Sequence, residues 1–172
     1  MSGWDSYRTV HGAELRATAR EFAVHGWPAV EESATVLRLV TGTALDVLEV
    51  PAAVGRGICA HLRAADVVVP VAGTPMGAWW YPVAPGAVLP ADLREAEGVV
   101  LHSAGATVLA PPSQVPDGWM HWRVAPALTG YRVPSADLIV LAATESVRLR
   151  ADRDRHPGAQ RPAAAVAGGM RF

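Results

Sequence analysis

The chain has 172 residues, a formal charge of -1, and 51% hydrophobic against 18% charged residues, a composition that describes one ordinary globular domain and excludes two large ones. All 15 cations are arginines, because the sequence contains no lysine, and this excludes chemistry that needs a Schiff-base amine, a lysine nucleophile or a phosphate-loop lysine. The single cysteine, Cys59, forms no internal disulfide, the start lacks a leader pattern, and no apolar run approaches the roughly 18 residues of a membrane span, so we expect a cytoplasmic protein without membrane contact.

The apolar pattern of the first half predicts two helices and a series of short strands. A stripe formed by Leu15, Ala19 and Phe22 predicts a helix over residues 11–24. The Ala-rich segment 52–64 predicts a second helix. Strands are expected at residues 27–30, 34–40, 44–50, 67–71 and 78–83, the last two joined by a hairpin-like connection.

The second half predicts two more helices, three strands and a proline-rich loop. Residues 90–97 have Pro near the start and Gly just past the end, as helices prefer, and Ser135 is a good N-cap for a last helix directed toward Arg148 and Arg150. Because residues 151–172 hold hardly any large apolar side chain, we expect a flexible tail there. The strands are expected at 99–101, 107–110 and 120–124, and the loop at 111–118.

The order of these elements favours an α+β fold. The strands are grouped in pairs and do not alternate strictly with helices, which indicates a mixed or antiparallel sheet flanked by helices. We therefore expect a single domain over residues 1–150, a length that comfortably supports one hydrophobic core.

Two carboxylates lie in one expected strand, Asp46 and Glu49. Side chains alternate along an extended strand, so residues three apart point to opposite faces, and only a bulge would bring the two acids to one metal ion. The simpler interpretation is that one or both are exposed strand residues or a cap.

The histidines are scattered singly, and this spacing argues against a structural zinc site. His102 and His121 are on different expected strands and could approach each other across a sheet, as a titrating or phosphate-binding pair. The alternative is that both are surface or rim residues.

Nucleophile and phosphate motifs are weak in this chain. Ser103 lacks the first glycine of a nucleophile elbow, and Cys59 is expected to be a buried small hydrophobe. More unusual is Pro111-Pro112-Ser113, whose prolines fix the loop rigidly. Such a turn suits a nucleotide or phosphate contact through Ser113, and it equally suits a stable hairpin corner.

At this segment the chain resembles the bifunctional DNA primase/polymerase N-terminal domain, the prim-pol branch of the archaeo-eukaryotic primase superfamily. The resemblance is carried by residues 105–113, which end in Ala-Pro-Pro-Ser, by Gly118 to Trp122, and by an N-terminal helix that leads into Gly26-Trp27-Pro28. It covers residues 11–145. The use of Arg without Lys and the richness in Ala and Val are typical of a degenerate, actinobacterial-type relative.

The resemblance implies DNA primase/polymerase chemistry, in which carboxylates at the ends of adjacent strands chelate metal ions for nucleotidyl transfer. Counting from Pro51, Gly77 and Pro111 aligns apolar residues with all the expected catalytic positions. These are Leu48 and Val50 for an acidic pair, Trp79 for a histidine and Val100 for a third acid. We therefore expect that the family's activity has been lost and that no metal cofactor is bound.

Three functions follow as hypotheses. The first is a non-catalytic module that binds single-stranded DNA or a nucleotide through arginines, aromatic stacking and the rigid loop. The second is a nucleotidyltransferase that uses Asp46, Glu49 and His102 with Mg²⁺ or Mn²⁺. The third is a protein-interaction scaffold built on exposed tryptophan-rich strands. The residues expected in the first case are Arg56, Arg63, Trp79, Trp80, Ser113, Trp122 and Arg123, with Arg132 as a further cation.

Overall fold

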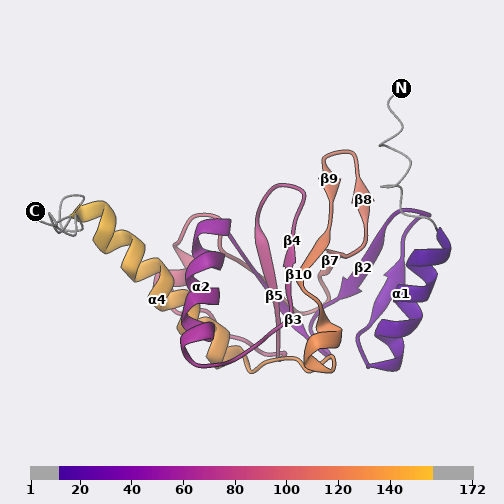
Figure 1. Cartoon of the computed structure of the whole chain (residues 1–172), viewed down its shortest axis with the longest axis horizontal. Helices are drawn as coiled ribbons and strands as arrows, with labels where there is room; N and C mark the ends of the chain where they lie inside the picture. Colours follow the sequence, from indigo (N-terminus) through magenta and orange to yellow (C-terminus); the bar gives the residue numbers. More distant parts are fainter. Residues whose placement is uncertain (1–11, 157–172) are drawn as a thin grey trace, which may run out of the picture.

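A five-stranded antiparallel sheet divides the hydrophobic interior into two layers (Figure 1). The computed structural model of the chain describes residues 12–156. Every strand pair in this sheet is antiparallel, so the expected α+β fold with an antiparallel sheet flanked by helices is confirmed. In spatial order the strands are β10 (His121–Val124), β4 (Val71–Gly73), β5 (Trp79–Val83), β3 (Asp46–Val50) and β6 (Val100–His102).

One face of this sheet is covered by helices α2 (Ala52–Ala64), α3 (Ala91–Arg94) and α4 (Ala136–Arg155). The apolar side chains of α2 and α4 pack on alternate strand residues, because only every second residue of a strand faces a given layer. Ser135 caps α4 as expected, its hydroxyl accepting a hydrogen bond from Leu138 N at 3.4 Å. The buried residues of this helix layer include Leu48, Val50, Ile58, Tyr81 and Ile139.

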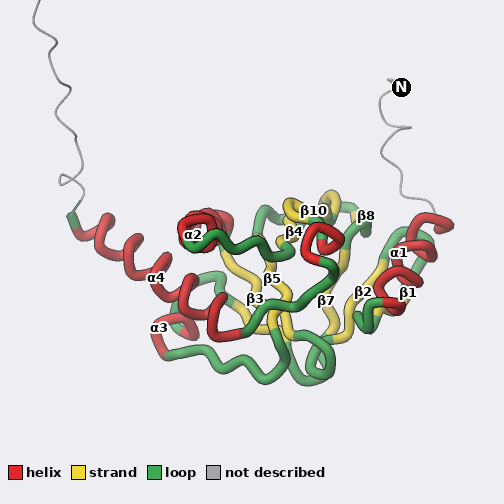
Figure 2. The backbone as a smooth tube through the Cα atoms, turned by 60° about the horizontal axis from the view of Figure 1, so that its bottom comes forward, coloured by secondary structure: helices red, strands yellow, loops and turns green. Residues whose placement is uncertain are grey.

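The opposite face of the five-stranded sheet packs against a second, smaller sheet. This sheet contains β1 (Ala29–Glu31), β2 (Leu37–Val40) and β7 (Thr107–Ala110), all antiparallel, and α1 (Gly12–Val24) lies beside β1. Figure 2 shows the strands between α1 on one side and the α2–α4 layer on the other. The buried residues between the two sheets include Phe22, Trp27, Leu39, Val47, Trp80 and Met120.

Two connections cross between the sheets at one end. Residues 41–45 link β2 to β3, and residues 103–106 link β6 to β7. They are hydrogen-bonded to each other, since Thr41 N donates to Ala106 O at 2.9 Å and Gly105 N donates to Thr41 O at 3.0 Å. Gly42 has a φ of 100°, and a Cβ there would lie 2.6 Å from Ala104 N, so this crossing requires glycine.

Several elements differ from the sequence-based expectation. The expected loop at 111–118 contains a small hairpin of β8 (Gln114–Val115) and β9 (Gly118–Trp119), whose strands are too short to produce an alternating pattern. A 3₁₀ turn over Pro126–Thr129 was not expected, β4 begins only after Pro70, and the helix expected at 90–97 ends at Arg94.

Helix α4 extends beyond the expected domain end. Residues 151–155 belong to the expected tail, yet they are helical, and Arg155 Nη2 forms an ion pair with Asp152 Oδ1 at 2.6 Å within the last turn. The polar sequence continues the helix until His156, which precedes Pro157, where the helix conformation is disfavoured. The rest of the expected tail, residues 157–172, lies outside the described residues. Among residues 12–156, no helix is long and apolar enough to cross a membrane.

Candidate functional site

The two acids of β3 lie on opposite faces of the five-stranded sheet, as the alternation of strand side chains predicted. Asp46 is fully buried, and its Oδ2 accepts a hydrogen bond from Gly86 N at 2.9 Å. It shares a face with Leu48 and Val50, which pack on the helix layer. Glu49 shares the other face with Val47, toward the smaller sheet. No bulge interrupts the pairing of β3 with β5, so nothing brings the two acids together.

Glu49 instead contacts a histidine from the neighbouring strand. Its Oε2 lies 3.0 Å from His102 Nε2, and the side chains are 32% and 26% exposed respectively. Glu49 lies directly opposite Trp80 on β5 and opposite Val100 on β6, whereas His102 pairs with Val47. Two of the three expected catalytic candidates are therefore in contact, and the third, Asp46, is separated from them by the sheet.

The expectation that His102 and His121 could approach each other across a sheet is wrong. His102 is on β6 and His121 on β10, and these are the opposite edge strands of the five-stranded sheet. His121 is exposed and lies against Gly73, where a Cβ would be 2.6 Å from the His121 ring carbon Cε1. The linear sequence placed each histidine on a strand but contained no information on which strands are neighbours.

Glu49 and His102 line a cavity between the two sheets. We call it the inter-sheet cavity, and its volume is about 160 Å³. The sequence-based candidates account for only part of its lining, because β7, the β4–β5 hairpin and the residue after β9 also contribute. The lining residues are Glu49, Thr74, Pro75, Trp80, His102, Thr107, Val108, Leu109 and Met120.

Two side chains of the inter-sheet cavity carry buried polar atoms without a hydrogen-bond partner. These atoms are Thr74 Oγ1 and Trp80 Nε1. Trp80 is 1% exposed and contacts Trp122 edge-on, with ring centroids 5.3 Å apart. Thr74 was missed by sequence reasoning. The sequence feature that could have identified Thr74 is its position directly after β4, at the start of the turn that leads into β5.

The apolar residues that counting aligned with the family's catalytic positions do not all face the inter-sheet cavity. Leu48, Val50 and Trp79 pack on the helix layer, and only Val100 shares a face with Glu49, its neighbour on β3. Trp79 lies under the guanidinium of Arg123, with Arg123 Cζ 3.9 Å from the ring centroid. The tryptophan that faces the inter-sheet cavity is Trp80, one residue further along β5.

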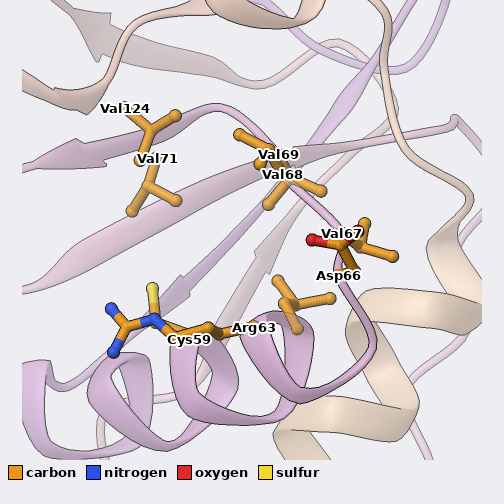
Figure 3. Close-up of a pocket in the computed structure, with 9 residues that line it drawn as sticks. Cys59, Arg63, Asp66, Val67, Val68, Val69, Val71 and Val124 are labelled. Atoms are coloured by element: carbon orange, nitrogen blue, oxygen red, sulfur yellow. The ribbon is translucent and has the colours of Figure 1, made fainter.

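The expected nucleic-acid residues are divided between the two faces of the five-stranded sheet: Trp79 and the Arg123 guanidinium that covers it lie on the helix side, and Trp80 and Trp122 lie between the sheets. Arg56 and Arg63 are exposed on α2, and Arg63 borders a separate apolar pocket with Cys59, shown in Figure 3. Cys59 is half-buried, with its Sγ 3.4 Å from Tyr81 Oη. Ser113 is fully buried between the β7 end and β2, where its hydroxyl accepts a hydrogen bond from Leu37 N and donates to Leu37 O.

The tryptophans of residues 12–156 are buried or half-buried. Trp80 is 1% and Trp79 8% exposed, while Trp119 and Trp122 are half-buried. The expectation of exposed tryptophan-rich strands is therefore wrong. The physical reason is that the apolar residues on both faces of β5 pack into the two interior layers. A strand with one face toward solvent would instead alternate apolar and polar residues.

The residues around the inter-sheet cavity do not fit the metal centre that the family resemblance implies. A divalent ion for nucleotidyl transfer is held by more than one carboxylate, and here Glu49 is the only acid in the lining. In the part of the chain that the structure describes, no three His, Cys, Asp or Glu residues come close enough to hold one ion.

The molecule is thus an α+β domain in which two antiparallel sheets enclose a cavity lined by an acid–histidine pair. The sequence model of the bifunctional DNA primase/polymerase N-terminal domain matches residues 8–138, and the chain belongs to this Prim-Pol family. Searches against curated proteins and against solved structures found no significant match.

Proposed function

We propose that this Prim-Pol domain binds a nucleotide or single-stranded nucleic acid without catalysing nucleotidyl transfer. The observation that supports the proposal is the composition of the inter-sheet cavity, where Glu49 is the only carboxylate and is already in contact with His102. Nucleotidyl transfer needs metal ions that clamp the triphosphate and activate the primer hydroxyl. A single acid that is already in contact with a histidine provides a weak ligand set for such ions.

A binding role is supported by the cations and by the unpaired polar atoms. Arg56, Arg63 and Arg123 are exposed and carry charge that can contact phosphates. The formal charge of -1 supplies little general attraction, so binding depends on these local groups and is expected to weaken steeply with salt. The buried Thr74 hydroxyl and Trp80 indole nitrogen have no hydrogen-bond partner among the described residues, and both side chains line the inter-sheet cavity.

Primer extension and strand binding test the two halves of the proposal. We expect no extension of a primed template with Mg²⁺ or Mn²⁺, and salt-sensitive binding of a labelled single strand measured by fluorescence anisotropy. Arg123→Gln is expected to weaken binding, and Arg38→Gln, at a residue paired with Glu32 on the smaller sheet, serves as the matched control. Metal-dependent extension would overturn the loss of catalysis, and no binding even at low salt would overturn the binding role.

The contact between Glu49 and His102 also favours a second candidate, a divergent nucleotidyltransferase with Mg²⁺ or Mn²⁺ at this pair. Asp46 has no place in such a site unless the sheet rearranges, because its side chain lies on the other face. This candidate predicts extension that Glu49→Gln abolishes and Asp46→Asn spares in the folded protein. Equal extension by the wild type and Glu49→Gln would contradict it.

A further inference from the structure

We propose that the inter-sheet cavity holds the amino-bearing edge of an uncharged heteroaromatic ring, as found in cytosine, adenine and guanine, and not the phosphate chain of a nucleotide. This inference rests on the proposed function and specifies which part of the ligand enters the cavity. It is carried by the unpaired polar atoms, the charge and the size of the cavity.

The unpaired polar atoms concentrate in this cavity. Within residues 12–156, three buried side-chain polar atoms have no hydrogen-bond partner, and two of them, Thr74 Oγ1 and Trp80 Nε1, belong to side chains that line it. Leaving a buried polar group unpaired is unfavourable, so such atoms favour a hydrogen-bonding partner. The indole nitrogen can only donate and the hydroxyl can donate or accept. Both atoms are closed to solvent in the free protein, so a ligand acceptor in the cavity would pair with them after a small shift of these side chains.

The charge of the lining excludes a phosphate chain as the favoured occupant. No arginine is among the nine lining residues, and the one acidic group is the carboxylate of Glu49. Phosphate oxygens beside this carboxylate would be repelled without a bridging cation. The same carboxylate is a good acceptor for an exocyclic amino group, as acidic side chains are for the N4 amino group of cytosine.

The walls and the size of the cavity suit one ring. Pro75, Val108, Leu109 and Met120 supply apolar contacts, and the methionine sulfur is suited to packing against an aromatic edge. The volume of about 160 Å³ is smaller than the roughly 300–1,000 Å³ of pockets that enclose whole drug-sized ligands. The cavity therefore accommodates a base-sized group, while the remainder of a nucleotide or strand stays outside.

Nucleosides without phosphate test the inference directly. Cytidine, adenosine, guanosine and uridine are titrated by calorimetry, because cytidine and uridine differ at the base mainly by an amino group in place of a carbonyl. We expect at least one amino-bearing nucleoside to bind about tenfold or more tightly than uridine, in line with the worth of a specific base contact. Glu49→Gln is expected to remove this preference, and inorganic triphosphate is expected not to compete.

The indole nitrogen provides a second readout that is independent of affinity. In a ¹⁵N-labelled protein, the Nε1–H resonance of Trp80, assigned by its loss in Trp80→Phe, is expected to shift when the nucleoside binds. Trp80→Phe keeps an aromatic side chain but replaces the indole by a smaller phenyl ring without the N–H donor, so it is expected to weaken binding, whereas Trp119→Phe, outside the cavity lining, is the control.

Each failure has a separate meaning. If the single strand binds but no nucleoside does, or if uridine binds as well as cytidine, adenosine and guanosine, the inference falls while the proposed function stands. Competition by inorganic triphosphate, or binding of Mn²⁺ that Glu49→Gln abolishes, would also overturn it. If neither strands nor nucleosides bind, the inference and the binding role fall together.

Discussion

At the scale of single residues, Ser113 is buried and hydrogen-bonded to the backbone, unlike a solvent-exposed polar residue of a loop. Its Oγ accepts from Leu37 N at 2.8 Å and donates to Leu37 O at 2.9 Å, in a fully buried position. We expect Ser113→Ala to lower the free energy of unfolding by about 1–3 kcal/mol, because the Leu37 amide and carbonyl would lose buried partners. Urea denaturation measures this, with Ser103→Ala as control. Equal stabilities would contradict the prediction, and strand binding by folded Ser113→Ala shows whether the hydroxyl also contacts the ligand.

Tyr81 makes the stability of the fold sensitive to alkaline pH. Burial, followed by the contact with Cys59, raises the pKa of Tyr81 well above its ordinary value, and its hydroxyl donates to Gly55 O at 2.8 Å. Above about pH 10 the unfolded tyrosine releases its proton while the folded one keeps it, so the free energy of unfolding falls as pH rises, by up to about 1.4 kcal/mol per pH unit.

Tyr81→Phe tests this linkage by urea denaturation at a series of pH values from neutral to strongly alkaline. The variant is expected to be less stable near neutrality by about 1 kcal/mol, because it lacks the hydrogen bond to Gly55 O. Its stability is also expected to fall less steeply at alkaline pH. A residual slope is expected from Tyr131, since burial and its contact with Glu21 raise the pKa of that tyrosine as well. Parallel slopes for the variant and the wild type would refute the assignment to Tyr81.

The residue types and the alternation of side chains along the strands predicted part of the candidate site. The opposed orientation of Asp46 and Glu49 followed from the pleat alone. The sequence did not indicate that Glu49 would meet His102, because about fifty residues separate them and only the placement of β6 beside β3 brings them together. The role of Trp80 could not be separated from that of Trp79, since both faces of β5 are buried.

At the scale of elements, α2 and α4 approach each other through a glycine. A Cβ on Gly57 would lie 2.0 Å from Ser146 Oγ, and that hydroxyl donates to Val54 O at 2.9 Å. We expect Gly57→Ala to destabilise the fold by about 1–3 kcal/mol through overpacking, although alanine favours a helix interior by about 1 kcal/mol relative to glycine. Thermal or urea unfolding provides the measurement.

The double variant Gly57→Ala with Ser146→Ala separates crowding from helix propensity. Removing the Ser146 hydroxyl relieves the shortest contact, so the double variant is expected to be more stable than the sum of the two single changes indicates. Additive losses would show that the close approach does not limit the packing of the two helices. Ala60→Gly, at an exposed position of α2, reports the propensity effect alone.

Elements with a long and consistent pattern were predicted best. Residues 52–64 form a helix over the full expected range, because an apolar stripe and alanine content both favour it. The β8–β9 hairpin was missed because each strand has two residues and is held by contacts from elsewhere, such as Gln114 N donating to Thr35 O at 2.8 Å. Local sequence does not contain that information.

At the scale of the whole molecule, the five-stranded sheet belongs to both interior layers. Because β3, β4, β5 and β10 contribute residues to both layers, we expect that neither layer loses its packing while the sheet stays intact. We expect thermal unfolding to be a single transition that is the same by tryptophan fluorescence and by far-ultraviolet circular dichroism. The fluorescence includes Trp27, Trp80 and Trp122 between the sheets as well as Trp79 in the helix layer, and circular dichroism reports on the helices. Two separated midpoints would show that the layers unfold independently.

The fold class was predictable because it depends on the order and grouping of elements, which the apolar pattern preserves. The division into two sheets was not, since β6 and β7 are adjacent in sequence and yet belong to different sheets. The turn at residues 103–106 makes this change of sheet, and its geometry depends on contact with residues 41–45, far away in the sequence.

That pair of crossing connections limits how the protein can admit a ligand. With Thr41 hydrogen-bonded to Ala106 and no space at Gly42 for a side chain, the two sheets are fastened at this end. On another side of the cavity, Pro75 of the β4–β5 turn lies near Gly118 of the β8–β9 turn, where a Cβ would be 3.4 Å from Pro75 Cβ. The Glu49 and His102 side chains are already partly exposed, so a small ligand can reach the cavity while this side stays closed.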